Sequence, residues 1–220
     1  MPSLLLVELS QVMRTAASTR AFRTDPVPDE VLYRALDGAR FAPSGGNRQG
    51  WRVVVVRDAG LRAVLRDLYL RGWRPYHREL LARAADDAAR RRMAAADGYA
   101  EHLDELPVHL VVLVELAALL ITDAGLDRPS IVGGASIYPF VQNVLLGLRE
   151  AGLGASLTTL LVPEEAEVRR ILGVPDGFAV AAHVGVGWPA RPHPVHLRRK
   201  AVEEFATVDG FGGAPLSGPG

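Results

Sequence analysis

The chain has 220 residues and no formal net charge, since 25 lysine and arginine residues balance 25 aspartate and glutamate residues. A neutral chain has no overall electrostatic attraction to nucleic acid or to an acidic membrane surface, so a small molecule is the expected partner. The lack of cysteine excludes disulfides and thiolate chemistry, and Lys200, the only lysine, lies near the C-terminus, which disfavours a Schiff-base mechanism.

The apolar content of 49% predicts a single well-buried domain over residues 1–220, with an apolar surplus that a partner subunit could cover. The apolar run at residues 4–7 has no basic start and ends at Glu8, so it does not resemble a signal peptide. A second run at residues 108–121 contains His109 and is too short to cross a bilayer. The sequence therefore predicts a soluble, cytoplasmic protein with no membrane partner.

Apolar residues at helical spacing predict the helices in chain order. Helices are expected over residues 4–17, 29–40, 135–151 and 163–172. A further helix is expected to follow the turn at residues 58–60 and to end at Arg71. The first two are separated by a connector that contains two prolines. The apolar stripe of residues 135–151 is wide enough to indicate burial in the core or against a partner.

Valine-rich and other apolar runs predict the strands. Strands are expected over residues 51–57, 108–115 and 179–186, and residues 155–160 form a short strand or an extended loop. The strand at residues 51–57 is expected to be buried on both faces. The irregular alternation of helices and strands predicts an α+β or three-layer domain with a mixed sheet.

Residues 75–105 are rich in alanine, arginine and aspartate, which indicates a largely exposed helical excursion. Acidic residues flank its arginine run at residues 90–92, so a solvated helix face explains the run better than a nucleic-acid patch does. The tail is rich in proline, histidine and arginine, includes a helix-like stretch at residues 202–206, and is expected to fray over residues 210–220.

A loop rich in glycine and serine at residues 42–50 leads directly into the first predicted strand. Ser44, Gly45 and Asn47 are turn formers that permit positive φ or the close approach of a ligand, and Pro43 stiffens the entry. Such a loop can bind a flat polar group. Its composition fits an ordinary helix-to-strand connection equally well.

Other motifs carry weaker signals. The glycines at residues 185–187 follow a predicted strand, but the Trp-Pro pair after them prevents the helix that a dinucleotide fingerprint requires. His193 and His196 lack a carboxylate partner, so surface positions are preferred to a metal site. His183 lies within an apolar strand and is expected to be a hydrogen-bonded core residue.

Three separate places suit a ligand with a phosphate at one end and a flat polar ring at the other: Ser18 with Arg20, the loop at residues 42–50, and the basic cluster at residues 198–200. Arginine provides charge-assisted, bidentate contacts to phosphate. Backbone N–H groups of a glycine-rich loop can meet the heteroatoms of a ring.

The segments Ser18-Thr19-Arg20-Ala21-Phe22 and Ala42-Pro43-Ser44-Gly45-Gly46-Asn47-Arg48-Gln49, before a tryptophan and a valine strand, resemble the N-terminal signature of the FMN-dependent nitroreductase family. The resemblance continues through Gln142-Asn143 and Gly152-Leu153-Gly154 to the basic cluster, and so covers nearly the whole chain. It implies a three-layer α+β sandwich with a central mixed, mainly antiparallel sheet flanked by helices. It also implies an intertwined homodimer with two FMN sites at the subunit interface.

The resemblance also implies which residues contact FMN. The phosphate would be held by Ser18, Arg20 and Arg199. The ribityl chain and ring would be lined by Pro43, Ser44, Gly45 and Asn47. Gln142, Leu157, Thr158 and Thr159 would lie near the isoalloxazine, and residues 75–105 would form a variable lid over the flavin.

Three positions depart from the family pattern. Ala16 stands where many members have a basic phosphate ligand, Gly50 where proline is usual, and Ala201 where proline often follows the basic cluster. Either Arg14 replaces the missing cation or FMN binds more weakly.

By resemblance, the activity is a ping-pong reaction in which NAD(P)H gives a hydride to flavin N5 and leaves, and a nitroaromatic, quinone or similar acceptor then takes the electrons. The flavin carries the chemistry, so no catalytic side chain and no metal are assigned. One alternative is another flavin enzyme of the same fold, either a dehalogenase or one that fragments reduced flavin. A flavin-binding or storage protein is a second, and a helical interaction protein whose glycine-rich loop is only a turn is a third.

Overall fold

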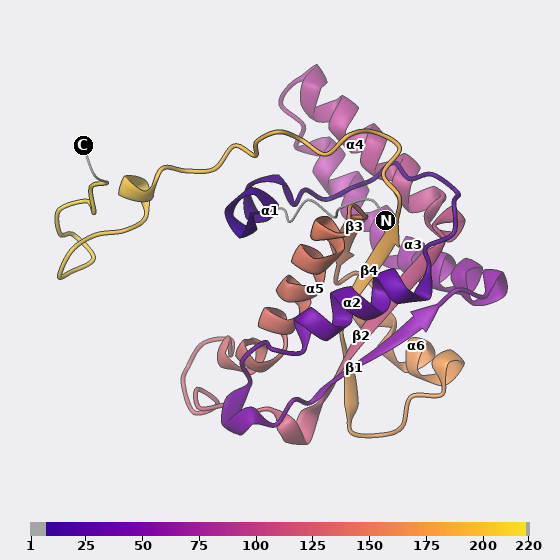
Figure 1. Cartoon of the computed structure of the whole chain (residues 1–220), viewed down its shortest axis with the longest axis horizontal. Helices are drawn as coiled ribbons and strands as arrows, with labels where there is room; N and C mark the ends of the chain where they lie inside the picture. The colour runs from indigo at the N-terminus through magenta and orange to yellow at the C-terminus, as the bar shows by residue number, and fades with distance from the viewer. Residues whose placement is uncertain (1–7, 219–220) are drawn as a thin grey trace.

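The computed structural model of the protein describes residues 8–218 and arranges them in three layers around one sheet (Figure 1). Strands β1 (Trp51–Val56), β2 (Val108–Glu115), β3 (Gly154–Thr158) and β4 (Phe178–Gly187) lie in the order β1-β2-β4-β3, and each neighbouring pair is antiparallel. A parallel bridge between Ser18 and Ala155 extends the sheet beyond β3. The expected α+β sandwich with a mixed, mainly antiparallel sheet is confirmed.

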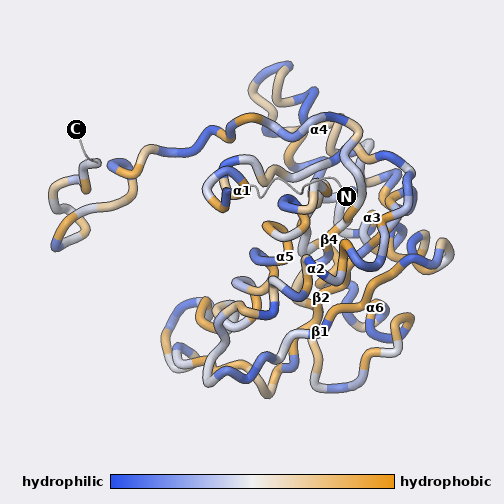
Figure 2. Tube along the Cα trace, in the orientation of Figure 1, coloured by the Kyte–Doolittle hydropathy of each residue, from blue (hydrophilic) through white to orange (hydrophobic). Residues whose placement is uncertain are grey.

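The two central strands carry most of the core, which Figure 2 shows as the concentration of hydrophobic residues at the middle of the molecule. β2 is buried from Val108 to Val114 because it has a strand on each side and helices over both faces. β1 lies at the edge of the sheet, where Arg52 and Val55 remain exposed. The expectation that β1 is buried on both faces is therefore wrong.

Six α-helices form the outer layers of the described chain. They are α1 (Leu9–Thr15), α2 (Asp29–Ala39), α3 (Ala59–Ala82), α4 (Asp87–Glu101), α5 (Tyr138–Glu150) and α6 (Glu165–Leu172). One core cluster lies between the sheet and helices α2 and α5, and the other lies between the opposite face and helices α3, α4 and α6. Residues 4–7 of the first predicted helix lie outside the described residues.

Helix α3 continues eleven residues beyond the predicted end at Arg71 and passes through Pro75. Proline removes one helix hydrogen bond, but Leu68, Tyr69 and Trp73 are buried just before it and hold the helix against the sheet. Helix α4 then packs back against α3, and its Tyr99 is buried as well. The predicted excursion is thus a hairpin with a buried inner face, and its arginine run at residues 90–92 is exposed as expected.

The apolar stripe of α5 is buried within its own chain. Phe140, Val141, Val144 and Leu148 pack in the cluster shared with α2 and the sheet. Packing in the core therefore accounts for this stripe without a second copy of the chain.

After β4 the chain leaves the body as an extended arm (Figure 1). It contains the short 3₁₀ helix Val202–Glu204 rather than the longer helix expected at residues 202–206. Val195 and Phe205 on the arm are 94% and 68% exposed. None of the helices within residues 8–218 has both the length and the apolar composition needed to cross a membrane.

Candidate functional site

The site begins where the segment after α1 lies along the free edge of β3. Ser18 bridges to Ala155, and the Thr19 N–H donates a 2.8 Å hydrogen bond to the Ala155 carbonyl. A side chain at Gly154 would lie 2.7 Å from Thr19, so glycine is needed for this close approach. This pairing places Ser18 and Arg20 beside β3.

A cavity of about 550 Å³ opens beside Arg20, between the end of β3 and the α3–α4 hairpin. Its floor is formed by residues 156–160, and its walls include Tyr69, Trp73, Tyr76 and Tyr99. The volume lies within the range of cofactor and ligand sites, about 300–1,000 Å³. Aromatic walls and one guanidinium suit a flat ring with a polar edge.

The phenols of Tyr69 and Tyr99 in this cavity remain neutral donors. Burial raises the pKa of Tyr99 and of Tyr69, and the charge of Arg20 acts in the opposite direction on both. The Tyr99 hydroxyl is buried beside Ser156, whose side chain acts with Arg20 to lower the pKa of Tyr99, although no hydrogen bond of good geometry forms there within residues 8–218.

A contact between α3 and α4 holds the hairpin together over the cavity. The Trp73 indole donates a 2.7 Å hydrogen bond to the Asp97 carboxylate. His77 stacks on Trp73 with ring centroids 5.3 Å apart, and its Nδ1 lies 3.4 Å from Asp97. The excursion at residues 75–105 therefore covers the end of β3.

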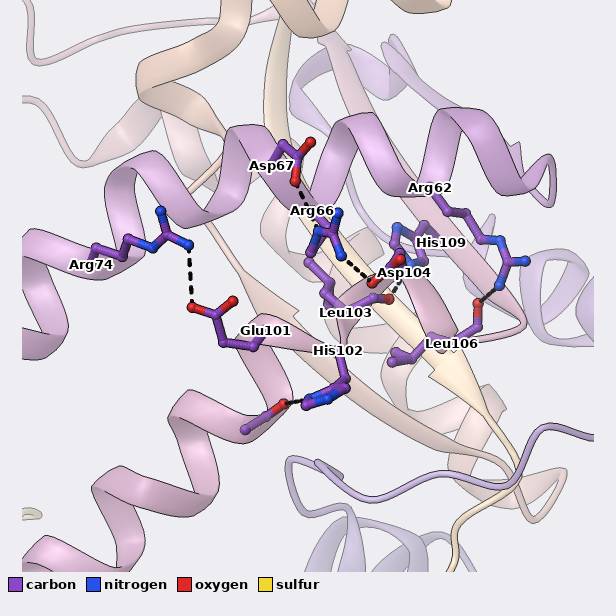
Figure 3. Close-up of polar contacts among 11 residues, drawn as sticks. Arg62, Arg66, Asp67, Arg74, Glu101, His102, Leu103, Asp104, Leu106 and His109 are labelled. Atoms are coloured by element: carbon purple, nitrogen blue, oxygen red, sulfur yellow. Dashed lines mark hydrogen bonds and ion pairs between the residues drawn. The ribbon is translucent and has the colours of Figure 1, made fainter.

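Polar contacts fix the far end of the hairpin to the rest of the domain (Figure 3). Arg66 of α3 forms an ion pair of 3.1 Å with Asp104, and Arg62 donates to the carbonyl of Leu106. His109 Nε2 on β2 lies 2.8 Å from the Leu103 carbonyl. The hairpin is thus anchored where it enters β2.

His183 of β4 lies opposite Thr158 of β3 in the sheet. It is fully buried, and neither ring nitrogen has a partner among the described residues. Its ring meets His109 edge-on, with centroids 4.9 Å apart. The prediction of a buried histidine holds, but the prediction that it is hydrogen-bonded is wrong, because the neighbouring strands use their polar groups in the ladder and offer apolar side chains.

The loop at residues 43–49 has a defined conformation. The Ser44 hydroxyl accepts from Gln49 N–H, and Gly45 N–H donates to the Ser136 hydroxyl, both at 3.0 Å. Gly46, Asn47 and Gln49 have φ values of 59°, 53° and 50°. Positive φ at three of four consecutive residues produces a compact turn rather than a simple connection.

The predicted site residues fall into two groups within one chain. The loop contacts Ser136, just before α5 begins, whereas Ser18 and β3 lie beyond the end of α5. Thirteen residues of α5 separate them by about 20 Å. Gln142 is exposed on α5 between the two groups.

The remaining predicted residues lie with Ser18 and β3 or near them. Leu157, Thr158 and Thr159 line the aromatic cavity. Arg199 is exposed on the arm, two residues after the Leu197 N–H donates to the Arg14 carbonyl at 3.1 Å. The aromatic walls were not anticipated, although Tyr69, Trp73 and Tyr76 recur at helical spacing.

Steric contact explains why residue 50 is a glycine. A Cβ at this position would lie 2.4 Å from the Cβ of Ala118, and the Gly50 carbonyl accepts a 2.8 Å hydrogen bond from the Glu115 N–H. The backbone at Gly50 therefore lies close against the end of β2 and the residues that follow it.

Replacing Gly50 by alanine is expected to lower the free energy of unfolding by about 1–3 kcal/mol through overpacking. Adding Ala118→Gly to this variant should restore most of the loss, which denaturant unfolding of the single and double variants would measure. Gly38→Ala is the control, since a methyl group at this position on α2 would meet no atom within 4 Å. A double variant as unstable as Gly50→Ala would refute the contact as the cause.

Comparison with known proteins agrees with this fold. The sequence matches the Nitroreductase family over residues 13–188. It is 32% identical over 195 residues to 5,6-dimethylbenzimidazole synthase of Rhodospirillum rubrum, covering 85% of this chain and 84% of the relative. It is 30% identical over 206 residues to an NADH dehydrogenase of Thermus thermophilus, covering 81% and 86%.

A solved structure shows the same fold. Oxidised iodotyrosine deiodinase, bound to FMN and 3-iodo-L-tyrosine, superposes with a TM-score of 0.70 at 25% identity, over 91% of this chain and 100% of that one. The matches in sequence and in structure both cover most of the chain. The chain belongs to the nitroreductase family.

Proposed function

We propose that the protein is a cytoplasmic FMN-dependent oxidoreductase that takes electrons from NAD(P)H and reduces nitroaromatic, quinone or similar acceptors. The observation that carries the proposal is the aromatic cavity of about 550 Å³ beside Arg20 and the end of β3. Its family membership and its relationship to an NADH dehydrogenase support the reaction class.

The residues present fit FMN. The cavity offers flat aromatic walls for a ring and the Arg20 guanidinium for its polar edge. Ser18 and Arg199 would hold the phosphate, and Arg20, which the resemblance assigns to the phosphate, would instead contact the ring because it lines the aromatic cavity. Leu157, Thr158 and Thr159 of the floor would lie against the ring.

A dimer would complete the site. The loop residues Pro43, Ser44, Gly45 and Asn47 lie about 20 Å from Ser18 within one chain, the length of α5. In a two-fold dimer the loop of one copy can meet the Ser18 region of the other, and the same contact then occurs twice. The exposed apolar side chains of the arm would be covered in such a pair.

When bound, FMN supplies the hydride chemistry between the nicotinamide and the acceptor. The protein's own groups orient the ring and set its surroundings. Arg20 favours negative charge at the polar edge of the ring, and Tyr69 and Tyr99 stay protonated as neutral donors because burial raises the pKa of each. The α3–α4 hairpin, held together through Trp73 and Asp97, forms one side of this space.

A second candidate is a different reaction of bound FMN. The relationship to 5,6-dimethylbenzimidazole synthase and the structural match to iodotyrosine deiodinase favour considering it. A charged amino-acid substrate is less favoured, because Arg20 is the one charged residue among those that line the aromatic cavity within the described part of the chain. A flavin-binding or storage role is the outcome if bound FMN resists reduction by NADH and NADPH.

The purified protein is expected to bind FMN, and Arg20→Ala should weaken binding about ten- to a hundredfold, because one charge-assisted contact is lost. Titration followed by flavin fluorescence would measure both. Arg23→Ala is the matched control, since the Arg23 guanidinium is exposed and already paired with Asp25 at 2.7 Å.

Anaerobic addition of NADH, then NADPH, then an acceptor separates binding from turnover. Bleaching of the flavin absorbance by a pyridine nucleotide and its return with a quinone or nitroaromatic are the expected results. A protein that ignores FMN would refute the proposed function.

A further inference from the structure

A second, smaller cavity of about 50 Å³ lies on the opposite face of β3 from the aromatic one. Side chains alternate along a strand, so Ala155 and Leu157 point toward α5 while Ser156 and Thr158 point toward α3. Leu157 lines both cavities, so the two cavities lie on either side of this residue. The small cavity can take a compact group but not a flat ring system.

Arg149 is the permanently charged residue that lines this cavity. It lies in the last turn of α5, and its Nε atom is buried without a hydrogen-bond partner in residues 8–218. No carboxylate of the described chain lines the cavity, and none of the ion pairs found within residues 8–218 includes Arg149. An arginine at a cavity that no carboxylate lines can bind an anion through its charge.

The other lining residues indicate which anion. Ala16, Ala17 and Ser18 form one wall, so the hydroxyl proposed to contact phosphate lies at the same cavity as Arg149. His193 forms another wall, with Nε2 3.4 Å from the Gly152 carbonyl. Burial, and then the charge of Arg149, lower the pKa of His193, so the guanidinium acts directly on the groups around this cavity.

We propose that Arg149 binds the phosphate group of FMN and supplies the positive charge that Ala16 does not. The proposal rests on the proposed function, since it takes FMN as the ligand. With the phosphate in the small cavity and the ring in the aromatic cavity, Leu157 would lie between the two ends of FMN. Arg14, the other nearby arginine, is exposed on α1 and is not among the residues that line the cavity.

Comparing FMN with riboflavin tests this role, because riboflavin has the ring and the ribityl chain but no phosphate. Both would be titrated into wild type, Arg149→Gln, Arg149→Lys and the control Arg14→Gln. Arg149→Gln is expected to weaken FMN binding about ten- to a hundredfold and to leave riboflavin affinity unchanged. Arg149→Lys should recover part of the loss, and Arg14→Gln should match wild type.

Equal losses for FMN and riboflavin in Arg149→Gln would make Arg149 a structural residue and overturn the proposal. Full FMN affinity in that variant, with a loss in Arg14→Gln, would overturn it in favour of Arg14. Inorganic phosphate gives a check that needs no variant: it should compete with FMN and not with riboflavin on the wild-type protein. A wild type that binds neither flavin would instead refute the proposed function itself.

Discussion

Acidification is expected to lower the free energy of unfolding by about 3 kcal/mol through His109 alone, because the pKa of this buried histidine is lowered from 6.5 to about 4. Burial is the main cause. The charge of Arg62 lowers the pKa further, while the Leu103 carbonyl and Asp104 act in the opposite direction. His183, fully buried beside it, has a pKa well below its usual value for the same reason.

The direction of the effect follows from the order of the two pKa values. The unfolded chain takes up the proton near pH 6.5, whereas the folded protein resists it until about pH 4. Between these values the unfolded state binds more protons, so stability falls as the pH falls. The full contribution is present above pH 6.5.

Denaturant unfolding at several pH values would measure this dependence. His183→Leu is expected to remove the part of this dependence that His183 contributes, to leave the part that His109 contributes, and to raise stability in acid, since neither nitrogen of His183 has a partner to lose within the described chain. Val184→Ala on the same strand is the control, because removing buried methyl groups should lower stability equally at every pH. A His183→Leu protein with the wild-type pH dependence would contradict the account.

Much of the fold could be predicted from local pattern. The valine run at β1 and the apolar run at β2 identify strands, and the spacing of Leu32, Ala35 and Leu36 identifies α2. The end of α3 could not be predicted in this way, because Pro75 is a local stop signal and the packing of Trp73 against the sheet is a tertiary effect. The partial exposure of β1 could not be predicted either, since nothing in its sequence indicates that it is an edge strand.

The candidate site shows the same division. The sequence identifies Ser18, Arg20 and the loop at residues 42–50 as ligand-binding segments, but not that α5 holds them apart within one chain. Arg149 was missed because a single arginine in an amphipathic helix looks like a solvated residue. Only the structure places Arg149 and Ser18 at the same cavity and leaves the Arg149 Nε without a partner among the described residues.

A dimer with Arg20→Ala in one copy and Asn47→Ala in the other is expected to regain one intact FMN site, although a homodimer of either variant has two defective ones. Each homodimer should bind FMN about ten- to a hundredfold more weakly than wild type. In the mixed dimer one site receives both substitutions and the other receives neither, because each site takes Arg20 from one copy and the loop from its partner.

The central claim is that this nitroreductase-family protein binds FMN at a site shared between two copies, and flavin stoichiometry in the mixed dimer tests it most directly. The two variants would be co-expressed with different affinity tags, the mixed dimer isolated through both tags, and FMN titrated by absorbance. We predict one tightly bound FMN per mixed dimer. A mixed dimer with no tight site, or a monomer that retains FMN, would contradict the shared site.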